Sequence, residues 1–176
     1  MKKIIILLSA ILIIFIVSKN VQAEESIIPD SAIRFRVIAN SNTVYDQNIK
    51  IQIRNLVQNE ILKYIKDSES IEKTRKIILE HKEELYNIIS NKLKDLNYDK
   101  GFNISYGFNH FPEKKYKGVT YKEGDYESLV ITLGDGNGDN FWCVLFPPLC
   151  LLESDEQVSE VEYKFFLQEI IDKIFK

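Results

Sequence analysis

Hydrophobic and polar positions follow two different periods along the chain. Apolar and basic residues alternate over residues 33–37, which predicts a half-exposed strand. Apolar residues then recur every three or four positions over 44–65 and again over 71–96. Polar residues with capping side chains separate these two segments at 67–70, so the pattern predicts two amphipathic helices after the first strand.

In the second half of the chain the period changes to two. Aromatic and aliphatic residues alternate with small polar ones over Phe102–Phe108, and apolar segments at Tyr126–Leu133 and Phe141–Phe146 complete three predicted strands. The Lys- and Tyr-rich segment Pro112–Gly124 predicts a long irregular loop. An amphipathic pattern from Val161 to Phe175 predicts a closing helix.

The predicted order of elements is strand, two helices, three strands and a helix. This order indicates an α+β domain, in which an antiparallel sheet of about four strands has helices packed on one face. The sequence contains no internal repeat and no linker, so residues 24–176 are expected to form a single globular domain.

The N-terminal residues have the pattern of an export signal. Two lysines precede an apolar run from Ile4 to Val17, and the small residue Ala23 follows at a cleavage position. Residues 1–23 are therefore expected to be a cleaved signal peptide, which gives the protein its one transient contact with a membrane. The alternative is an uncleaved anchor, but the apolar run is shorter than the roughly 20 residues that span a bilayer, and Lys19 follows it.

The charge balance argues against a nucleic-acid partner. The chain has 23 Lys and Arg, 26 Asp and Glu and a net charge of −3, and removal of the signal peptide takes away basic residues only. Nucleic-acid binding requires a basic face that releases counterions. The sequence also contains no phosphate-binding loop, Cys/His metal cluster or pair of catalytic carboxylates that stands out, so no cofactor is expected.

Two cysteines, Cys143 and Cys150, flank a segment with a tandem proline. Outside the cytoplasm two thiols this close are expected to be oxidised, and the prolines can turn the chain back to bring the Cα atoms within disulfide distance. Two buried free thiols are the alternative. A catalytic thiol would need a histidine base, and neither His81 nor His110 has a recognisable local signature.

The segment Asp135–Asp139 resembles the first half of a calcium-binding loop, because acidic or amide side chains occupy every second position, with glycine between them. The sixth position is Asn140 rather than Gly and the twelfth is Phe146 rather than Glu, so the second half of the pattern fails. A glycine-rich hairpin between the two flanking strands is the favoured interpretation.

Basic residues could gather where the first strand meets the first helix. These are Arg34, Arg36, Lys50 and Arg54, of which the last two lie four positions apart and share one helical face. By composition alone, an ordinary solvated surface is favoured.

Segments in both halves of the chain resemble the stage II sporulation protein R family. In the N-terminal half they are Ile28-Pro29-Asp30, Ala32-Ile33-Arg34, Arg36–Ser41, and Asp46-Gln47 followed by Lys50 and Arg54. In the distal half they are Gly124–Glu127, Leu129–Ile131, Gly134–Gly138 and, as the most specific one, Phe141–Cys150. The resemblance covers essentially the whole exported chain, although residues 71–96 and 111–121 match loosely.

The resemblance implies a signalling protein rather than an enzyme. Members of this family are made in the forespore and exported into the space between the forespore and mother-cell membranes. There they activate the sporulation sigma-E factor-processing peptidase, a membrane aspartic protease that removes the pro-sequence of sigma-E. Residues 24–176 would then be a single signalling domain. A secreted hydrolase acting at the septal cell wall and a structural protein of the septal space are the alternatives.

Polar side chains of the matched N-terminal half are the first candidates for receptor contact. They are Arg34, Arg36, Asn40, Asp46, Lys50 and Arg54. Trp142, with the neighbouring tandem proline, is a candidate apolar anchor, because aromatic residues dominate interface energetics. No catalytic, cofactor-binding or metal-binding residue is expected.

Overall fold

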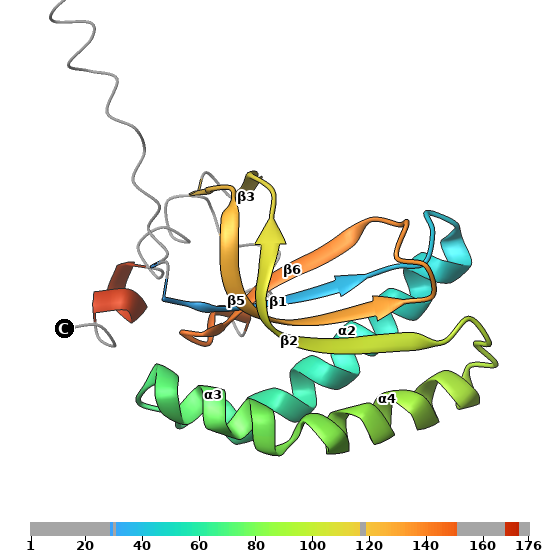
Figure 1. The fold of residues 1–176 in the computed structure, drawn as a ribbon, viewed down its shortest axis with the longest axis horizontal. Coiled ribbons are helices and arrows are strands. Elements are labelled where there is room, and N and C mark those ends of the chain that lie inside the picture. The colour runs from blue at the N-terminus through green and yellow to red at the C-terminus, as the bar shows by residue number, and fades with distance from the viewer. Residues whose placement is uncertain (1–28, 30, 117–118, 151–167, 173–176) are drawn as a thin grey trace, which may run out of the picture.

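A computed structural model describes residues 29, 31–116, 119–150 and 168–172 of this protein (Figure 1). The predicted signal peptide and most of the predicted closing helix lie outside the described residues, although 168–172 are helical. The elements in chain order are β1 (Ile33–Ile38), α2 (Val44–Ile65), α3 (Ile71–Glu80), α4 (Lys82–Asp95), β2 (Phe102–Phe111), β3 (Lys114–Tyr116), β4 (Val119–Tyr121), β5 (Gly124–Leu133) and β6 (Asn140–Phe146). No helix within these described ranges is both long and apolar enough to cross a membrane.

Four of the strands form one sheet in the order β2-β5-β1-β6. The pairs β2–β5 and β1–β6 are antiparallel, whereas β1 and β5 run parallel. The helices α2, α3 and α4 all lie on one face of this sheet (Figure 1). The predicted α+β class and the one-sided helical layer are therefore confirmed, and the sheet is mostly rather than wholly antiparallel.

The prediction of a hairpin between β5 and β6 is wrong, because β1 lies between these two strands. The glycine turn, residues 134–139, crosses the end of β1 instead. Gly138 N–H donates to the Ala39 carbonyl at 2.8 Å and Asn137 N–H donates to the Asn40 carbonyl at 3.0 Å. A side chain at Gly138 would collide with the Ser41 carbonyl, so the close approach of the two backbones requires glycine there.

The predicted single helix over 71–96 is also wrong, because it is broken at His81 into α3 and α4. His81 has φ −94° and ψ 2°, outside the helical region. Its ring stacks on Tyr64 of α2 with 3.8 Å between centroids, and its Nδ1 lies 2.8 Å from Glu84 Oε2. The break lets α3 and α4 both pack against α2.

The predicted irregular loop over Pro112–Gly124 contains a β-hairpin. Lys114 of β3 pairs with Tyr121 of β4, three residues beyond the last pair of the β2–β5 ladder, Phe111 with Gly124. The hairpin thus continues that ladder past the main sheet, and β3 and β4 pair with each other.

The hydrophobic core lies between the sheet and the layer of α2, α3 and α4. Phe35 of β1 and Ile53 and Val57 of α2 are fully buried, as the apolar stripe of this helix predicts. β1 differs from the predicted half-exposed strand, because Arg34, on the opposite face from Phe35, is only 4% exposed.

Candidate functional site

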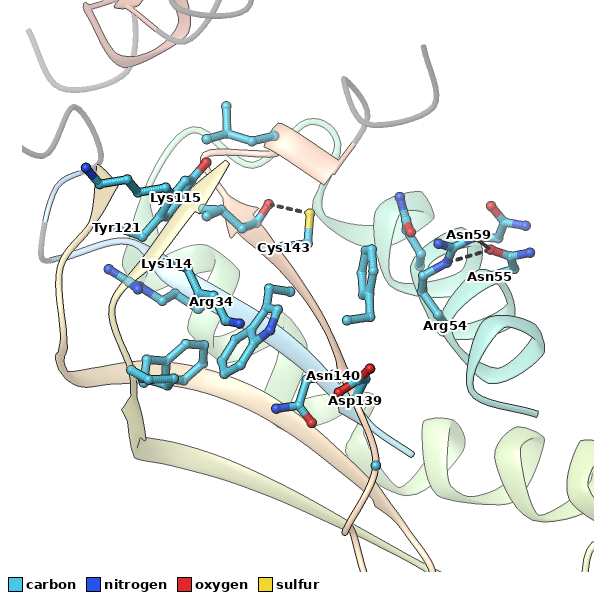
Figure 2. A pocket seen from close by; sticks show the side chains of 18 residues that line it. Arg34, Arg54, Asn55, Asn59, Lys114, Lys115, Tyr121, Asp139, Asn140 and Cys143 are labelled. Atoms are coloured by element: carbon cyan, nitrogen blue, oxygen red, sulfur yellow. Dashed lines mark hydrogen bonds between the residues drawn. The ribbon is translucent and has the colours of Figure 1, made fainter. Parts of the chain in front are cut away.

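A groove of about 970 Å³ runs along β6, between α2 and the β3–β4 hairpin (Figure 2). The described residues that line it are Arg34, Arg54, Asn55, Gln58, Asn59, Phe111, Pro112, Lys114, Lys115, Tyr121, Gly138, Asp139, Asn140, Phe141, Trp142, Cys143, Val144 and Leu149. In Figure 2, Lys114 and Lys115 lie on one side of β6, and Arg54 lies on the other.

Arg34, Phe111 and Trp142 form the floor on one side of β6, and Tyr126 contacts Arg34 from outside the lining. The Arg34 guanidinium carbon lies 3.2 Å from the centroid of the Tyr126 ring and 5.4 Å from that of Phe111. The Trp142 ring meets Phe111 edge-on at 5.0 Å. These cation–π and edge-to-face contacts hold the floor in one arrangement before any ligand is bound.

Arg36 fixes Trp142 from the neighbouring strand. The Arg36 guanidinium carbon is 4.3 Å from the indole centroid, and its Nη1 donates to the His110 carbonyl at 3.4 Å. With the amide of Asn140 oriented so that its oxygen faces Arg36, that oxygen accepts from Nη2 at 2.8 Å. Burial lowers the pKa of Arg36 from its ordinary value, although a guanidinium remains charged. Arg36 therefore supports the groove without lining it.

On the α2 side, Arg54 faces the groove without an acidic partner among the residues that the structure describes. Its Nε and Nη2 donate to the Asn55 amide oxygen at 2.9 and 2.7 Å, and its guanidinium carbon lies 4.9 Å from the Phe141 ring. Within the described ranges, no carboxylate forms an ion pair with Arg54, Lys114 or Lys115. Since Asp139 is the one acidic residue among the described residues of the lining, this described lining carries an excess of positive charge.

Asn40 and Asp46 are engaged in the interior rather than in the groove. Asp46 is 1% exposed and accepts hydrogen bonds from the Asn40 amide at 2.8 Å, the Ser41 hydroxyl at 2.5 Å and the Lys100 ammonium at 3.0 Å. The bonds from Asn40 and Ser41, with a smaller contribution from Lys100, lower the pKa of Asp46 to about 2. The Asn40 amide oxygen in turn accepts from the Asp135 N–H at 3.0 Å, which holds the glycine turn.

Lys50 is likewise committed to an internal contact. It is 9% exposed and donates to the Gln47 amide oxygen at 2.5 Å and to the Asp139 carbonyl at 3.1 Å. Burial lowers the pKa of Lys50, partly offset by the charge of Asp139. The structure therefore brings Arg34, Arg54 and Trp142 together around the groove, and uses Asn40, Asp46 and Lys50 to fasten α2 to the glycine turn.

Several lining residues were not among the sequence candidates. The helix contributes Asn55, Gln58 and Asn59, and the hairpin contributes Lys114 and Lys115. The adjacent lysines at 114 and 115 are visible in the sequence, but the irregular loop that the sequence predicts over Pro112–Gly124 gives no reason to place them beside β6.

The predicted disulfide between Cys143 and Cys150 is present, with 5.6 Å between the two Cα atoms. Among the described residues no cysteine is free, so the alternative of two free thiols does not describe this structure. Gln58 of α2 donates to the Cys150 carbonyl at 2.8 Å. The disulfide and this hydrogen bond brace the exit of β6 at one end of the groove.

In the described part of the chain, no group of three or more His, Cys, Asp or Glu side chains is arranged to hold a metal ion. The segment that resembles half of a calcium loop makes internal contacts instead. Its Asp139 N–H donates to the Asn42 amide oxygen at 2.6 Å, as Asp135 N–H does to Asn40.

The structure defines the protein as an α+β domain with a groove, lined by several cationic side chains, at the edge of its sheet. Residues 29–156 match the family described as Stage II sporulation protein R. The chain is 36% identical over 178 residues to Stage II sporulation protein R of Bacillus subtilis (strain 168), an alignment that covers 98% of this chain and 80% of that protein. No solved structure matches the chain. The chain belongs to the stage II sporulation protein R family, and its role is in sporulation.

Proposed function

We propose that this protein is the secreted signal through which the forespore activates the mother cell's sporulation sigma-E factor-processing peptidase. It is exported into the space between the two membranes and binds the exposed part of that membrane aspartic protease. The observation that carries the proposal is family membership over residues 29–156, together with the near full-length match to the Bacillus subtilis protein.

The proposed mechanism is a shift of the protease towards its active state by binding. A ligand shifts a conformational equilibrium only as far as its affinities for the two states differ. The groove along β6 suits such a role because its aromatic floor is already held by Arg34 and Arg36. A preorganised surface loses little side-chain entropy on binding. The protein itself performs no chemistry in this proposal, and the partner carries out the proteolysis.

Two features support export. Residues 1–23 have the pattern of a signal peptide. The disulfide between Cys143 and Cys150 is typical of proteins that fold in an oxidising compartment. The same disulfide counts against the thiol version of the secreted-hydrolase alternative, because it occupies the sulfur that would act as nucleophile.

The test is pro-sigma-E processing in vegetative cells that express the peptidase and pro-sigma-E. Three arms are compared: no added protein, the full chain, and a chain that lacks residues 2–23. Processing is expected only with the full chain, because the truncated chain stays on the wrong side of the membrane. Absence of processing with the full chain, once export and folding are verified, would refute the proposed function.

A further inference from the structure

β6 lies at the edge of the main sheet, and the groove runs along its outer side. Within the described residues β6 pairs with β1 alone. In an antiparallel pair, every second residue of an edge strand directs its N–H and C=O away from the neighbouring strand. These backbone groups can bind a further strand laid into the groove.

The groove has room and side chains for such a strand on both faces of β6. Phe141 and Trp142 are consecutive, so their side chains point to opposite faces of the sheet. Trp142 lies against Phe111, whereas Phe141 lies against Phe35 at 6.1 Å and under Arg54. A peptide added alongside β6 would therefore alternate its side chains between two aromatic surfaces.

The charge of the groove differs from that of the whole chain. Arg54, Lys114 and Lys115 line it with no acidic partner in the described ranges, against Asp139 as the one acid of the described lining. The chain as a whole has a net charge of −3. A local excess of cations on an acidic protein selects an acidic ligand and repels a basic one.

We propose that β6 is the docking edge for an extended acidic segment of a partner protein. The segment adds to the sheet as a further strand through main-chain hydrogen bonds. Its carboxylates lie against Arg54 on one side and against Lys114 and Lys115 on the other. The inference rests on the proposed function only in naming the peptidase as the protein that carries this segment.

The protein offers an internal probe of this docking, because Trp142 is its only tryptophan. The exported protein is titrated with a synthetic peptide in which Glu alternates with Thr, followed by Trp142 fluorescence and calorimetry. Saturable binding with a change in Trp142 emission is expected. The same peptide with alternate backbone amides methylated on the binding side is expected to lose binding, because it cannot complete the ladder. A peptide with Lys in place of Glu is expected not to bind.

Charge-reversed variants locate the site. Arg54→Glu, and Lys114→Glu combined with Lys115→Glu, are each expected to weaken the acidic peptide about tenfold. Lys76→Glu is the matched control, since Lys76 is an exposed lysine of α3 outside the groove, and its variant should bind like the wild type. Circular dichroism and thiol alkylation verify that each variant is folded with its disulfide intact.

Four outcomes would overturn the inference. The first is that the acidic peptide shows no saturable binding at millimolar concentration, and the second is that the methylated peptide binds as well as the unmethylated one. The third is that Lys76→Glu weakens binding as much as the groove variants do. The fourth is that the protein binds phosphatidylglycerol vesicles but not the peptide. In the processing assay, a groove variant that activates as well as the wild type would overturn the assignment of the peptidase as the protein that carries this segment. A wild type that fails to activate would instead refute the proposed function and leave the peptide measurements standing, so the two failures are distinguishable.

Discussion

Asp46 at the start of α2 and Lys100 before β2 form an ion pair of 3.0 Å across 54 residues of sequence. The carboxylate is buried, and it is also bonded to Asn40 and Ser41. Next to Lys100, the Gly101 carbonyl accepts from the Gly134 N–H at 2.9 Å. One buried carboxylate therefore joins the first helix, the entry of β2 and the turn that leads to β6 and its groove.

Replacing Asp46 with Asn is expected to lower the free energy of unfolding at pH 7 by about 2 kcal/mol. The reason is that the pKa of Asp46 falls from 3.8 to about 2 on folding, and each unit of pKa shift corresponds to about 1.4 kcal/mol. A carboxyl with a depressed folded pKa stabilises the fold above its unfolded pKa. This contribution is lost as the pH falls from about 4 to about 2.

Urea denaturation of the wild type and of Asp46→Asn between pH 7 and pH 2 measures this effect. The two stabilities should converge at the acid end. Asp67→Asn is the control, because Asp67 is exposed at the end of α2 and its replacement should change the free energy of unfolding at pH 7 little. A constant difference between the wild type and Asp46→Asn across this range would contradict the assignment.

Arg75 of α3 and Glu127 of β5 fasten the helical layer to the sheet. Arg75 donates from Nε and Nη2 to the two carboxylate oxygens at 2.7 and 2.8 Å, and the Tyr106 hydroxyl donates to Oε1 at 2.6 Å. Arg75→Ala should destabilise the protein by about 1–3 kcal/mol, because it leaves a largely buried carboxylate without its main partner.

The size of this pair is measured by a double-mutant cycle with Arg75→Ala and Glu127→Gln, from thermal or urea unfolding. Lys76→Ala is the comparison, since Lys76 and Glu80 form an exposed pair at 3.7 Å, and its loss should cost less than about 0.5 kcal/mol. Equal effects of Arg75→Ala and Lys76→Ala would argue against a structural role of the Arg75–Glu127 pair.

Gly138→Ala should destabilise the glycine turn by about 1–3 kcal/mol, because the added methyl group meets the Ser41 carbonyl and Ala39. Gly101→Ala is the matched variant: Gly101 has φ +74° but open space around an added Cβ, so only backbone strain of about 1 kcal/mol is expected. Unfolding curves for both variants give the comparison. A Gly138→Ala protein as stable as the wild type would mean that the turn does not need this close approach.

The disulfide makes a further prediction. Alkylation of the exported protein without reductant should modify neither Cys143 nor Cys150. Replacing both with Ser should lower stability by about 2 kcal/mol, because the bond closes a short loop. Mass spectrometry measures the alkylation, and thermal unfolding measures the loss of stability. Two alkylated thiols in the exported protein would contradict the structure at this point.

The site was predictable from the sequence only in part. Arg34, Arg54 and Trp142 were expected at a binding surface, and the structure gathers them around one groove. Charge patterns could not separate them from Asp46 and Lys50, which are buried and internally bonded. Whether a charged side chain faces solvent depends on which other segments cover it, and those segments lie far away in the sequence.

The sequence by itself determined the types of most elements, the bounds of α2, the α+β class and the expectation that Cys143 and Cys150 pair. These follow from local periodicity, capping residues and the spacing of two cysteines, which each segment carries without reference to the others. Only the tertiary structure decided the insertion of β1 between β5 and β6, the break at His81 and the groove beside β6. Strand order and helix breaks are set by long-range packing, because a local period reports which face of a segment is buried but not which neighbour buries it.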